Sequence, residues 1–419
     1  MDYRAIVILC LEALFALWLL YRSGVLKSRR SVAVSVLLLA AAFVIRALCL
    51  DYVTPDYQDF LSKWVDFYRR GGGFRVFYYP LGNYNIPYLY FLCLFSYSSI
   101  NDLYLIKLLS IFFDVLLAWG SMLLLGRCKS SPALRIACFF TVLLLPTVVL
   151  NGSLWAQCDS IYVALAVLGI YLALDDRPVL SVACFALSFG FKLQAVFVLP
   201  VMAVLWFKGK YKLRHFFLFP VFYILLVLPA VALGKPFIDT LLLYAGQTGS
   251  IGDGLNYNSP SVFAFFQYSV TDTGLASRLG IAAAFAFMAA VLALCAVRRR
   301  NLGDGAVIAA AVLLAVGIPF FLPHMHDRYF FAADVLTVVM AYAFAKYSAA
   351  ALLTQFASLL GYHAYLKMRY LLLMDHGARA LTAVILMAAA LLVSQLRHAV
   401  TAPENTDKEI NPGNSKIRS

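Results

Sequence analysis

The sequence predicts an all-α fold, a polytopic bundle of transmembrane helices with about thirteen membrane segments. The first observation is composition: 63% of the residues are hydrophobic and 13% are charged, whereas soluble domains are about half apolar and a quarter charged. The second is length, because apolar runs able to cross about 30 Å of hydrocarbon recur along nearly the whole chain. The third is pattern: the runs are continuous rather than alternating, which excludes a membrane β-barrel.

Short loops and two long polar stretches separate the apolar runs. The runs lie near residues 5–21, 31–50, 102–126, 134–150, 159–175, 178–191, 194–207, 215–233, 278–297, 305–322, 328–346, 349–366 and 378–396. We interpret residues 1–396 as a single transmembrane domain with loops at 51–100 and 234–277, and 397–419 as a disordered cytoplasmic tail. The first run lacks a basic n-region and a small-residue cleavage site, so we expect no cleaved signal peptide.

The net charge of +13 is explained by short basic loops rather than by a nucleic-acid-binding surface. The strongest of these loops are Arg22 to Arg30, Arg127 to Arg135, Lys208 to Arg214 and Arg298 to Arg300. Placing all of them in the cytoplasm puts the N-terminus outside and the C-terminus inside. The eight cysteines form no CxxC pair and mostly lie in apolar runs, so we interpret them as small hydrophobic residues.

The stretch 178–207 is one long apolar run whose two ends both adjoin basic loops. It must therefore enter the membrane and return, with arms of about 14 residues, or about 21 Å of helix. Its tip, around Lys192 and Gln194, then stops below the outer surface, where a lysine needs water or an anionic partner. The alternative is one tilted helix with Lys192 packed in the bundle, which inverts every later segment.

The outer side then carries the polar stretches 51–100 and 234–277 and the short turn 323–328, whereas the cytoplasmic side has only short basic loops. This asymmetry argues against an enzyme that uses cytosolic nucleotide sugars or ATP. The sequence also contains no Walker A motif, Rossmann glycine pattern or kinase motif.

An acid-rich amphipathic helix is predicted at the start of the first long loop. Asp51, Asp56, Asp59 and Asp66 follow a membrane exit, and apolar positions recur at helical spacing over 60–68. One interpretation is that this helix only anchors the loop. The other is that a carboxylate is fixed where membrane and water meet, and can take a proton from an attacking hydroxyl.

Two further outer segments carry aromatic and amide side chains. In 82–95, Tyr84 and Asn85 are candidates to line a groove, and interfacial anchoring of the aromatic residues is the alternative. In 151–160, a tryptophan face and amide groups suit a sugar ring, although the acid there could simply cap the next helix. The candidates in this second segment are Asn151, Trp155, Gln157 and Asp159.

The turn at 322–331 places two histidines, an acid and an arginine at an outer helix start. His324 and His326 are two residues apart, which is not the spacing of a helical metal pair. Arg328 fits a phosphate better, because its guanidinium forms bidentate hydrogen bonds, and Lys192 adds a second cation. The alternative is that Asp327 and Arg328 only cap the helix and pair with each other.

Two charged residues lie inside the first membrane segments. Glu12 lies in the first segment, and Arg46 lies near the outer end of the second. A charge at that depth needs a partner, so we expect these two to form a buried pair with no catalytic role.

Six stretches, in one order over roughly residues 40–365, resemble the bacterial integral-membrane glycosyltransferases of the GT-C superfamily, specifically those related to the second mannosyltransferase of GPI-anchor synthesis. The stretches are 56–64, 82–90, 106–114, 150–162, 189–200 and 321–336. No single stretch is specific, and their common order carries the resemblance. Lys63 stands where related chains often have proline, and Asp327 stands where glutamate is usual, but neither departure removes a proposed catalytic group.

The resemblance implies a GT-C-like fold and an inverting hexosyltransferase on the extracytoplasmic face of the cell membrane. The implied donor is a polyprenyl-phosphate-linked sugar, with mannose expected, and the acceptor is a hydroxyl of a glycan, glycolipid or protein. Asp56 is the implied catalytic base. The donor site is assigned to Lys192, His324, His326, Asp327 and Arg328, and the substrate groove to Tyr57, Asp59, Tyr84, Asn85, Asn151, Trp155, Gln157, Asp159 and Gln194.

No cofactor is required by this scheme, the question of a divalent metal stays open, and no nucleic-acid partner is expected. A polytopic lipid or glycan transporter or flippase is the main alternative, because it also holds polar residues in the membrane. Such a fold is expected to show an internal repeat, and none is clear in the sequence. A non-catalytic assembly subunit is the second alternative.

Overall fold

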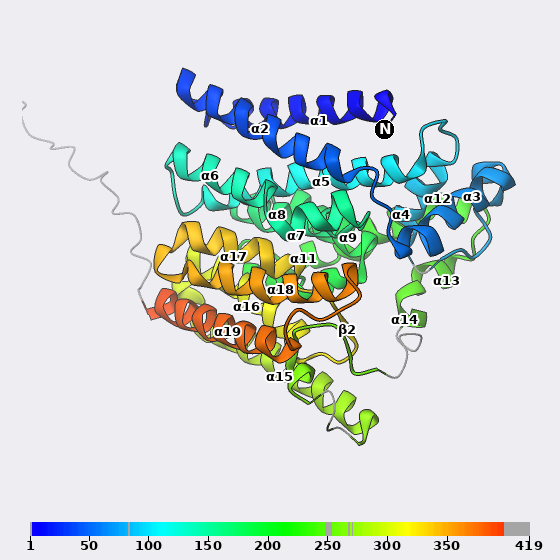
Figure 1. Cartoon of the computed structure of the whole chain (residues 1–419). Helices are drawn as coiled ribbons and strands as arrows, with labels where there is room; N and C mark the ends of the chain where they lie inside the picture. Colours follow the sequence, from blue (N-terminus) through cyan, green and yellow to red (C-terminus); the bar gives the residue numbers. More distant parts are fainter. Residues whose placement is uncertain (1, 83, 248–253, 267–268, 270, 398–419) are drawn as a thin grey trace, which may run out of the picture.

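A computed structural model describes residues 2–82, 84–247, 254–266, 269 and 271–397, and these residues form a bundle of helices (Figure 1). The long helices lie side by side, with the N-terminus at one end of the bundle and the end of α19 (Met374–Arg397) at the other (Figure 1). The predicted all-α polytopic fold is confirmed. The predicted tail 397–419 falls outside the described residues apart from Arg397.

The first half of the chain supplies α1 to α10. Its elements are α1 (Tyr3–Arg22), α2 (Arg29–Cys49), the π-helix η1 (Tyr57–Leu61), α3 (Ser62–Gly71), η2 (Gly73–Val76), α4 (Ile86–Phe95), α5 (Asp102–Leu125), α6 (Pro132–Leu143), α7 (Pro146–Val148), the π-helix η3 (Val149–Leu154), α8 (Asp159–Leu174), α9 (Pro178–Phe191), η4 (Leu193–Phe197) and α10 (Val201–Phe207).

In its described residues, the second half adds nine α-helices and a two-stranded parallel ladder. Its elements are α11 (Leu213–Phe216), α12 (Leu218–Ala232), α13 (Phe237–Leu241), α14 (Leu243–Gln247), β1 (Asn256–Tyr257), η5 (Val262–Phe265), α15 (Thr273–Val297), η6 (Arg299–Asn301), α16 (Asp304–Phe321), β2 (Met325–His326), α17 (Phe331–Ala343), η7 (Ala345–Tyr347), α18 (Ala349–Leu366) and α19 (Met374–Arg397).

All thirteen predicted apolar segments fall on helices, but they differ in length. Among the described residues, seven helices are long and apolar enough to cross a membrane, or up to eight if the pair 132–143 and 146–154, bent by 42°, is one span. The segments at 159–175, 178–191, 194–207 and 328–346 form shorter apolar helices, and α18 has 18 residues but is not among the candidate spans. Helix α16, one of the seven, lies in the centre of the bundle, with 89% of its apolar window buried.

The stretch 178–207 turns back on itself, as the in-and-out interpretation predicts. Helix α9 ends where Lys192 adopts an extended conformation, with φ −152° and ψ 134°, and η4 and α10 follow. The residues just outside the two ends of this stretch meet, because Lys210 pairs with Asp176 at 2.7 Å. The alternative of a single tilted helix is therefore wrong.

The expected pair between Glu12 and Arg46 is also wrong. Arg46 lies 3.1 Å from Asp114 of α5 and donates to the carbonyl of Leu143 at 2.7 Å. One carboxyl oxygen of Glu12 is buried without a hydrogen-bond partner among the described residues. Sequence position could not reveal this, since Asp114 lies in an apolar helix distant in the chain and comes beside Arg46 only by packing.

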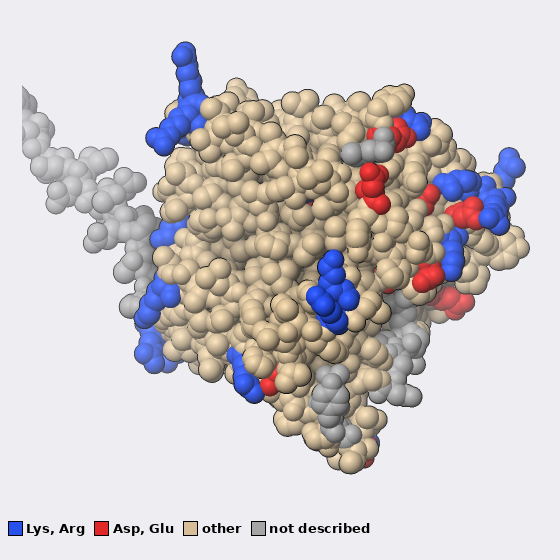
Figure 2. All heavy atoms as spheres, viewed as in Figure 1, with Lys and Arg blue, Asp and Glu red and all other residues tan. Residues whose placement is uncertain are grey.

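Charged side chains separate along the bundle. Lys and Arg side chains are spread along the left edge in Figure 2, whereas the right end shows acidic and basic side chains together. The right end is the one that carries the N-terminus, α3 and α4 (Figure 1). The amphipathic helix α3 lies there with Val65 and Tyr68 buried and Arg70 exposed, as the sequence predicts.

Candidate active site

A cavity of about 560 Å³ lies where several helix ends and loops meet. It is lined by Asp56, Phe60, Leu61, Trp64, Tyr84, Asn85, Gln157, Phe191, Lys192, Leu193, Gln194, Tyr244, Tyr257, His326, Asp327, Arg328, Tyr329 and Tyr365. Asp56, Lys192 and Arg328, which come from three distant parts of the sequence, therefore face one space. The structure brings these three predicted residues together.

Asp56 is held by the turn that follows the π-helix η3. Its Oδ2 accepts hydrogen bonds from Trp155 Nε1 at 2.9 Å and from Gln157 Nε2 at 2.8 Å. Between these two donors, Ala156 has φ 65°, a left-handed conformation that is unfavourable for a residue with a Cβ. The strained residue turns both neighbouring side chains toward the same carboxylate oxygen, so Oδ1 can take a proton without giving up either bond.

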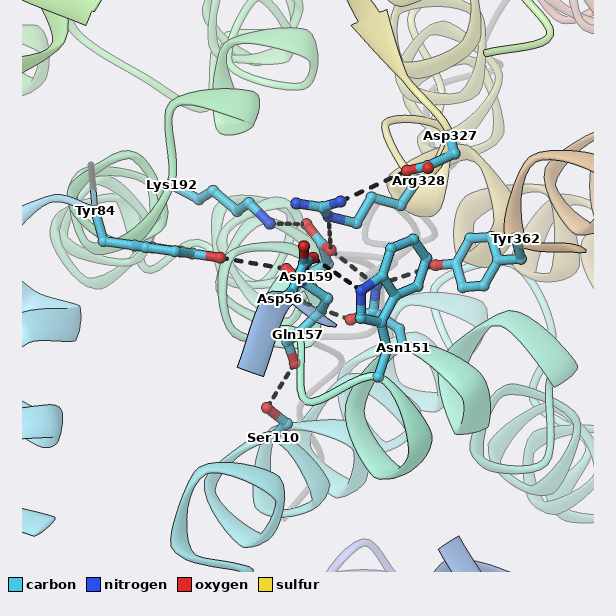
Figure 3. Close-up of polar contacts among 11 residues, drawn as sticks. Asp56, Tyr84, Ser110, Asn151, Gln157, Asp159, Lys192, Asp327, Arg328 and Tyr362 are labelled. Atoms are coloured by element: carbon cyan, nitrogen blue, oxygen red, sulfur yellow. Dashed lines mark hydrogen bonds and ion pairs between the residues drawn. The ribbon is translucent and has the colours of Figure 1, made fainter. Parts of the chain in front are cut away.

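Asp159 organises the two cations of the cavity (Figure 3). Its carboxylate lies 2.5 Å from Lys192 Nζ and 3.6 Å from Arg328 Nε, and its side chain is 1% exposed. It is the first residue of α8, where the helix dipole favours a negative charge, and it makes no side-chain cap. The carboxylate therefore fixes both cations at the cavity wall.

A layer of buried side chains supports Asp159 and Arg328 from behind. Asn151 Nδ2 donates to Asp159 at 2.8 Å and to the hydroxyl of Tyr362 at 3.0 Å. The guanidinium of Arg328 lies 5.1 Å from the ring centroid of Trp155, close enough for a cation–π contact. Asn151, Trp155 and Asp159 thus build the site from beneath rather than line it.

The amides and Tyr84 form a second wall. The hydroxyl of Tyr84 donates to Gln157 Oε1 at 3.2 Å (Figure 3). Asn85 lines the cavity and caps α4, and its amide nitrogen donates to Tyr223 at 3.1 Å. Gln194, just past the break at Lys192, also lines the cavity. These predicted groove residues do lie around one space.

The turn before α17 carries two groups with shifted pKa values. Burial, together with Arg328 and Lys192, lowers the pKa of His326 to about 4, so this imidazole is neutral at pH 7. It stacks on Tyr257, with ring centroids 4.7 Å apart and planes at 12°. His326 can therefore offer the cavity a hydrogen bond but not a positive charge.

Asp327 is the second of these groups. Burial raises its pKa to about 7, against the opposing effect of Arg328. Its Oδ1 lies 3.5 Å from Arg328 Nη1, so the two residues form the local pair that the sequence offered as an alternative. The pair does not exclude a ligand, because Arg328 also reaches Asp159 and lines the cavity. Helix α17 begins at Phe331 and neither residue caps it.

Three predicted site residues lie elsewhere. Tyr57 points to the start of α5, where its hydroxyl donates to Asp102 at 2.9 Å. Asp59 is exposed and pairs with Lys63 at 3.4 Å. The His324 ring lies 2.7 Å from the Gly254 carbonyl, so it braces a loop. None of them lines the cavity.

Sequence reasoning missed most of the aromatic wall of the cavity. Tyr257 reaches the site through the ladder in which Asn256 and Tyr257 of β1 pair with Met325 and His326 of β2. Tyr365 stacks on Trp155 at 4.1 Å, close to Asp56. Its only sequence signal is a cluster of tyrosine and histidine at the end of α18, which reads equally well as an interfacial belt.

A family model described as "Alpha-(1->6)-mannopyranosyltransferase, N-terminal domain" matches residues 94–208. The matched part runs from the end of α4 to the end of α10 and includes Gln157, Asp159 and Lys192 of the site. The match supports a bacterial membrane mannosyltransferase of the GT-C type, as the resemblance indicates. No curated protein matches the chain.

Proposed function

We propose that the chain is an inverting mannosyltransferase that moves mannose from a polyprenyl-phosphate-linked donor to an acceptor hydroxyl on the extracytoplasmic face of the cell membrane. The family match supports the transfer of mannose. The observation that carries the rest is that one carboxylate, Asp56, and two cations, Lys192 and Arg328, line the same cavity. A base and fixed positive charge are what displacement of a lipid phosphate requires.

In the proposed reaction, Oδ1 of Asp56 takes the proton of the acceptor hydroxyl while the hydroxyl oxygen attacks C1 of the mannosyl group. The bond between C1 and the phosphate oxygen breaks, and the polyprenyl phosphate leaves with the bonding electrons. Trp155 and Gln157 hold the carboxylate in place through Oδ2. A single displacement inverts C1, so an α-linked product, as in the name of the matched family, requires a β-linked donor.

Lys192 and Arg328 are placed to receive the charge that develops on the leaving phosphate. An ammonium group has three N–H donors and a guanidinium has five, and Asp159 uses only part of them. Fixed cations stabilise a developing negative charge more strongly in a site with little water than in bulk solvent. Asp159 keeps them from reorienting, so they remain aimed at the phosphate.

The proposed orientation follows from the distribution of charge. The basic loops lie at the end of the bundle opposite the N-terminus, and cytoplasmic loops are enriched in Lys and Arg (Figure 2). The cavity then opens on the extracytoplasmic side, where donors carried on polyprenyl phosphate present their sugar. Tags at residues 1 and 419 are expected to be accessible from opposite sides of sealed vesicles. Accessibility from one side alone would contradict this orientation.

The test is mannosyl transfer by the purified protein in liposomes, with β-linked polyprenyl-phosphate mannose and a mannose oligosaccharide acceptor. Asp56→Asn keeps the shape of the side chain but removes the base, and is expected to lower kcat at least a hundred-fold. Asp59→Asn is the matched control, because this acid is exposed three residues away and lies outside the cavity.

A transporter or an assembly subunit gives a different pattern. If Asp56→Asn folds and inserts normally and forms product at an unchanged rate, the assignment of Asp56 as the catalytic base is wrong. A wild-type protein that forms no product, while moving the lipid-linked sugar across the bilayer, would favour the transporter instead.

A further inference from the structure

Helix α5 carries a row of buried polar side chains that do not line the cavity. Lys107, Ser110 and Asp114 are fully buried in a mostly apolar helix. Their spacing of three and four residues places them along one face. They lie in the stretch 106–114, which contributes to the family resemblance but has no part in the proposed chemistry.

Lys107 forms hydrogen bonds to the linker that leads from the end of α2 to Asp56. A lysine buried in a membrane bundle requires partners for its charge. Its ammonium group finds them in three backbone carbonyls, as many as it has N–H donors. These carbonyls are those of Cys49 at 2.8 Å, Leu50 at 3.0 Å and Tyr52 at 2.6 Å.

Ser110 and Asp114 form hydrogen bonds to the segment 157–160 on the other side of the site. Ser110 Oγ donates to the carbonyl of Gln157 at 2.7 Å, and the hydroxyl of Ser160 donates to Asp114 Oδ1 (Figure 3 shows the first of these bonds). The two contacts therefore bracket residues 157–160. This bracket contains the amide that donates to Asp56 and the carboxylate of Asp159 that holds both cations.

Close packing and a buried ion pair fix this arrangement. A Cβ at Gly152 would lie 3.1 Å from Ser110 Cβ and 3.5 Å from Asp114 Oδ2, so the π-helix η3 packs closely against α5 at this glycine. Arg46 of α2 holds the second oxygen of Asp114 at 3.1 Å, and both side chains are 0% exposed. A fully buried ion pair of this kind adds little net stability, but it can fix the register in which α2 and α5 pack.

One further hydrogen bond joins the linker before Asp56 to the segment 151–160. Thr54, two residues before Asp56, donates to the carbonyl of Trp155 at 3.1 Å. The linker and the 151–160 segment are therefore tied to each other as well as to α5.

We propose that Lys107, Ser110 and Asp114 are positioning residues, through which α5 sets the base and the cation-holding carboxylate in register around one cavity. They act through Asp56 and Asp159 and contact no reacting atom. The catalytic consequence rests on the proposed function, whereas the positioning itself can be measured without any reaction.

The first experiment measures hydrogen–deuterium exchange of the amides in 151–160. Ser110→Ala removes one bond from this segment and is expected to speed exchange there about five-fold. Ser121→Ala is the matched control, because Ser121 is buried on the same helix and its hydroxyl has no partner among the described residues. Equal exchange in both variants contradicts the inference, whether or not the protein transfers mannose.

The second experiment is a double-mutant cycle on mannosyl transfer. Ser110→Ala is expected to lower kcat about five-fold in the wild type but less than two-fold when Gln157→Ala is already present, because the contact with Asp56 nearest to Ser110, the hydrogen bond from the Gln157 amide, is then already lost. A loss of folded protein lowers the rate by the same factor in both backgrounds, and that result refutes positioning. Ser160→Ala is expected to raise the donor KM about five-fold.

These measurements separate the two ideas. Faster exchange in Ser110→Ala together with an inactive wild type retains the positioning by α5 and rejects the proposed function. An active wild type with additive kcat effects and unchanged exchange in Ser110→Ala rejects the positioning and leaves the proposed function standing.

Discussion

The two ends of α8 carry matched arrangements of charge in different surroundings. At its start, Asp159 faces Lys192 and Arg328; directly after its end, Asp175 faces Arg127 at 3.7 Å and Arg177 at 3.2 Å. In each case one acid holds two cations. The side chain of Asp159 is 1% exposed, however, and that of Asp175 is 27% exposed.

The difference in exposure changes what the charges can do. Water and salt screen the cluster at Asp175, so its ion pairs contribute little to stability. The acid of the cluster at Asp159 is buried, and its cations stay in place because this acid, itself stabilised by the helix start, holds them there. An intramembrane charge therefore indicates a binding site when it borders a cavity, and the number of ion pairs alone does not.

The largest effect is expected on folding. Among the described residues, Asp159→Asn leaves Lys192 without its carboxylate partner and Arg328 with Asp327 alone, and it should destabilise the protein by roughly 3 kcal/mol or more. Asp175→Asn, at the other end of the same helix, should cost about 1 kcal/mol or less. Thermal unfolding of both variants in detergent measures the contrast. Equal losses of stability would show that burial does not distinguish the two clusters.

The next effect is expected on donor binding. Lys192→Ala and Arg328→Ala each remove charged hydrogen bonds to the donor phosphate, which should raise the donor KM about 10–100-fold. Arg127→Ala alters the exposed cluster and should leave this KM unchanged. Initial rates over a range of donor concentrations provide the measurement. Normal donor dependence in both cavity variants refutes the phosphate role.

A smaller effect is expected from pH. The pKa of Asp327 is raised to about 7, so its carboxyl is neutral below that pH and anionic above it. The anion competes with the donor phosphate for Arg328, so the donor KM should rise a few-fold between pH 6 and pH 8, while a phosphodiester itself does not titrate there. Asp56 and Asp159 raise this pKa further, and Arg328 lowers it. Asp327→Asn should remove the pH dependence, and its persistence in that variant argues against this residue as the source.

The same shift has a consequence for folding. Between about pH 4 and pH 7, the carboxyl of Asp327 holds its proton in the folded chain and has lost it in the unfolded chain. Its contribution to stability therefore falls as pH rises from about 4 to about 7, and Asp327→Asn should flatten that part of the stability curve.

The smallest effect is expected at the exposed cluster. Arg177→Ala removes one of the ion-pair partners of Asp175. Because the Arg177 side chain is 61% exposed, the change in stability should stay within about 1 kcal/mol and disappear in high salt. Melting temperatures at low and high ionic strength test this. A large, salt-independent loss would place this cluster in the same class as the one at Asp159.

Site residues at helix ends were predictable from sequence. Site residues that meet only because helices pack together were not. Lys192 was found because a charge interrupts an apolar run, and Arg328 because a polar turn follows one. The structure places both beside Asp56, as predicted. Periodicity could not show that Asp59 faces away from the cavity, because the π-helical turn at 57–61 shifts the phase of the helix.

Buried partners were missed for a related reason. Asp114 and Ser110 lie within an apolar helix, where sequence gives no hint of which side chain will meet which. Arg46 therefore received the wrong partner, Glu12. The similarity to membrane mannosyltransferases was predictable, because the stretches 106–114, 150–162 and 189–200, which carry part of the resemblance, lie in the region 94–208 that the family model matches.

The two π-helical turns, at 57–61 and 149–154, have a consequence for how this chain tolerates insertions and deletions. Each turn holds one residue more than an α-helix needs, and each adjoins a residue that contacts the carboxylate of Asp56 or carries it. Deleting a single residue from either turn would yield a regular helix, which folds with less local distortion. It would also rotate the flanking residues by about 100° and pull Asp56 away from Trp155 and Gln157. Homologous enzymes should therefore keep the length of both turns even where their sequences diverge.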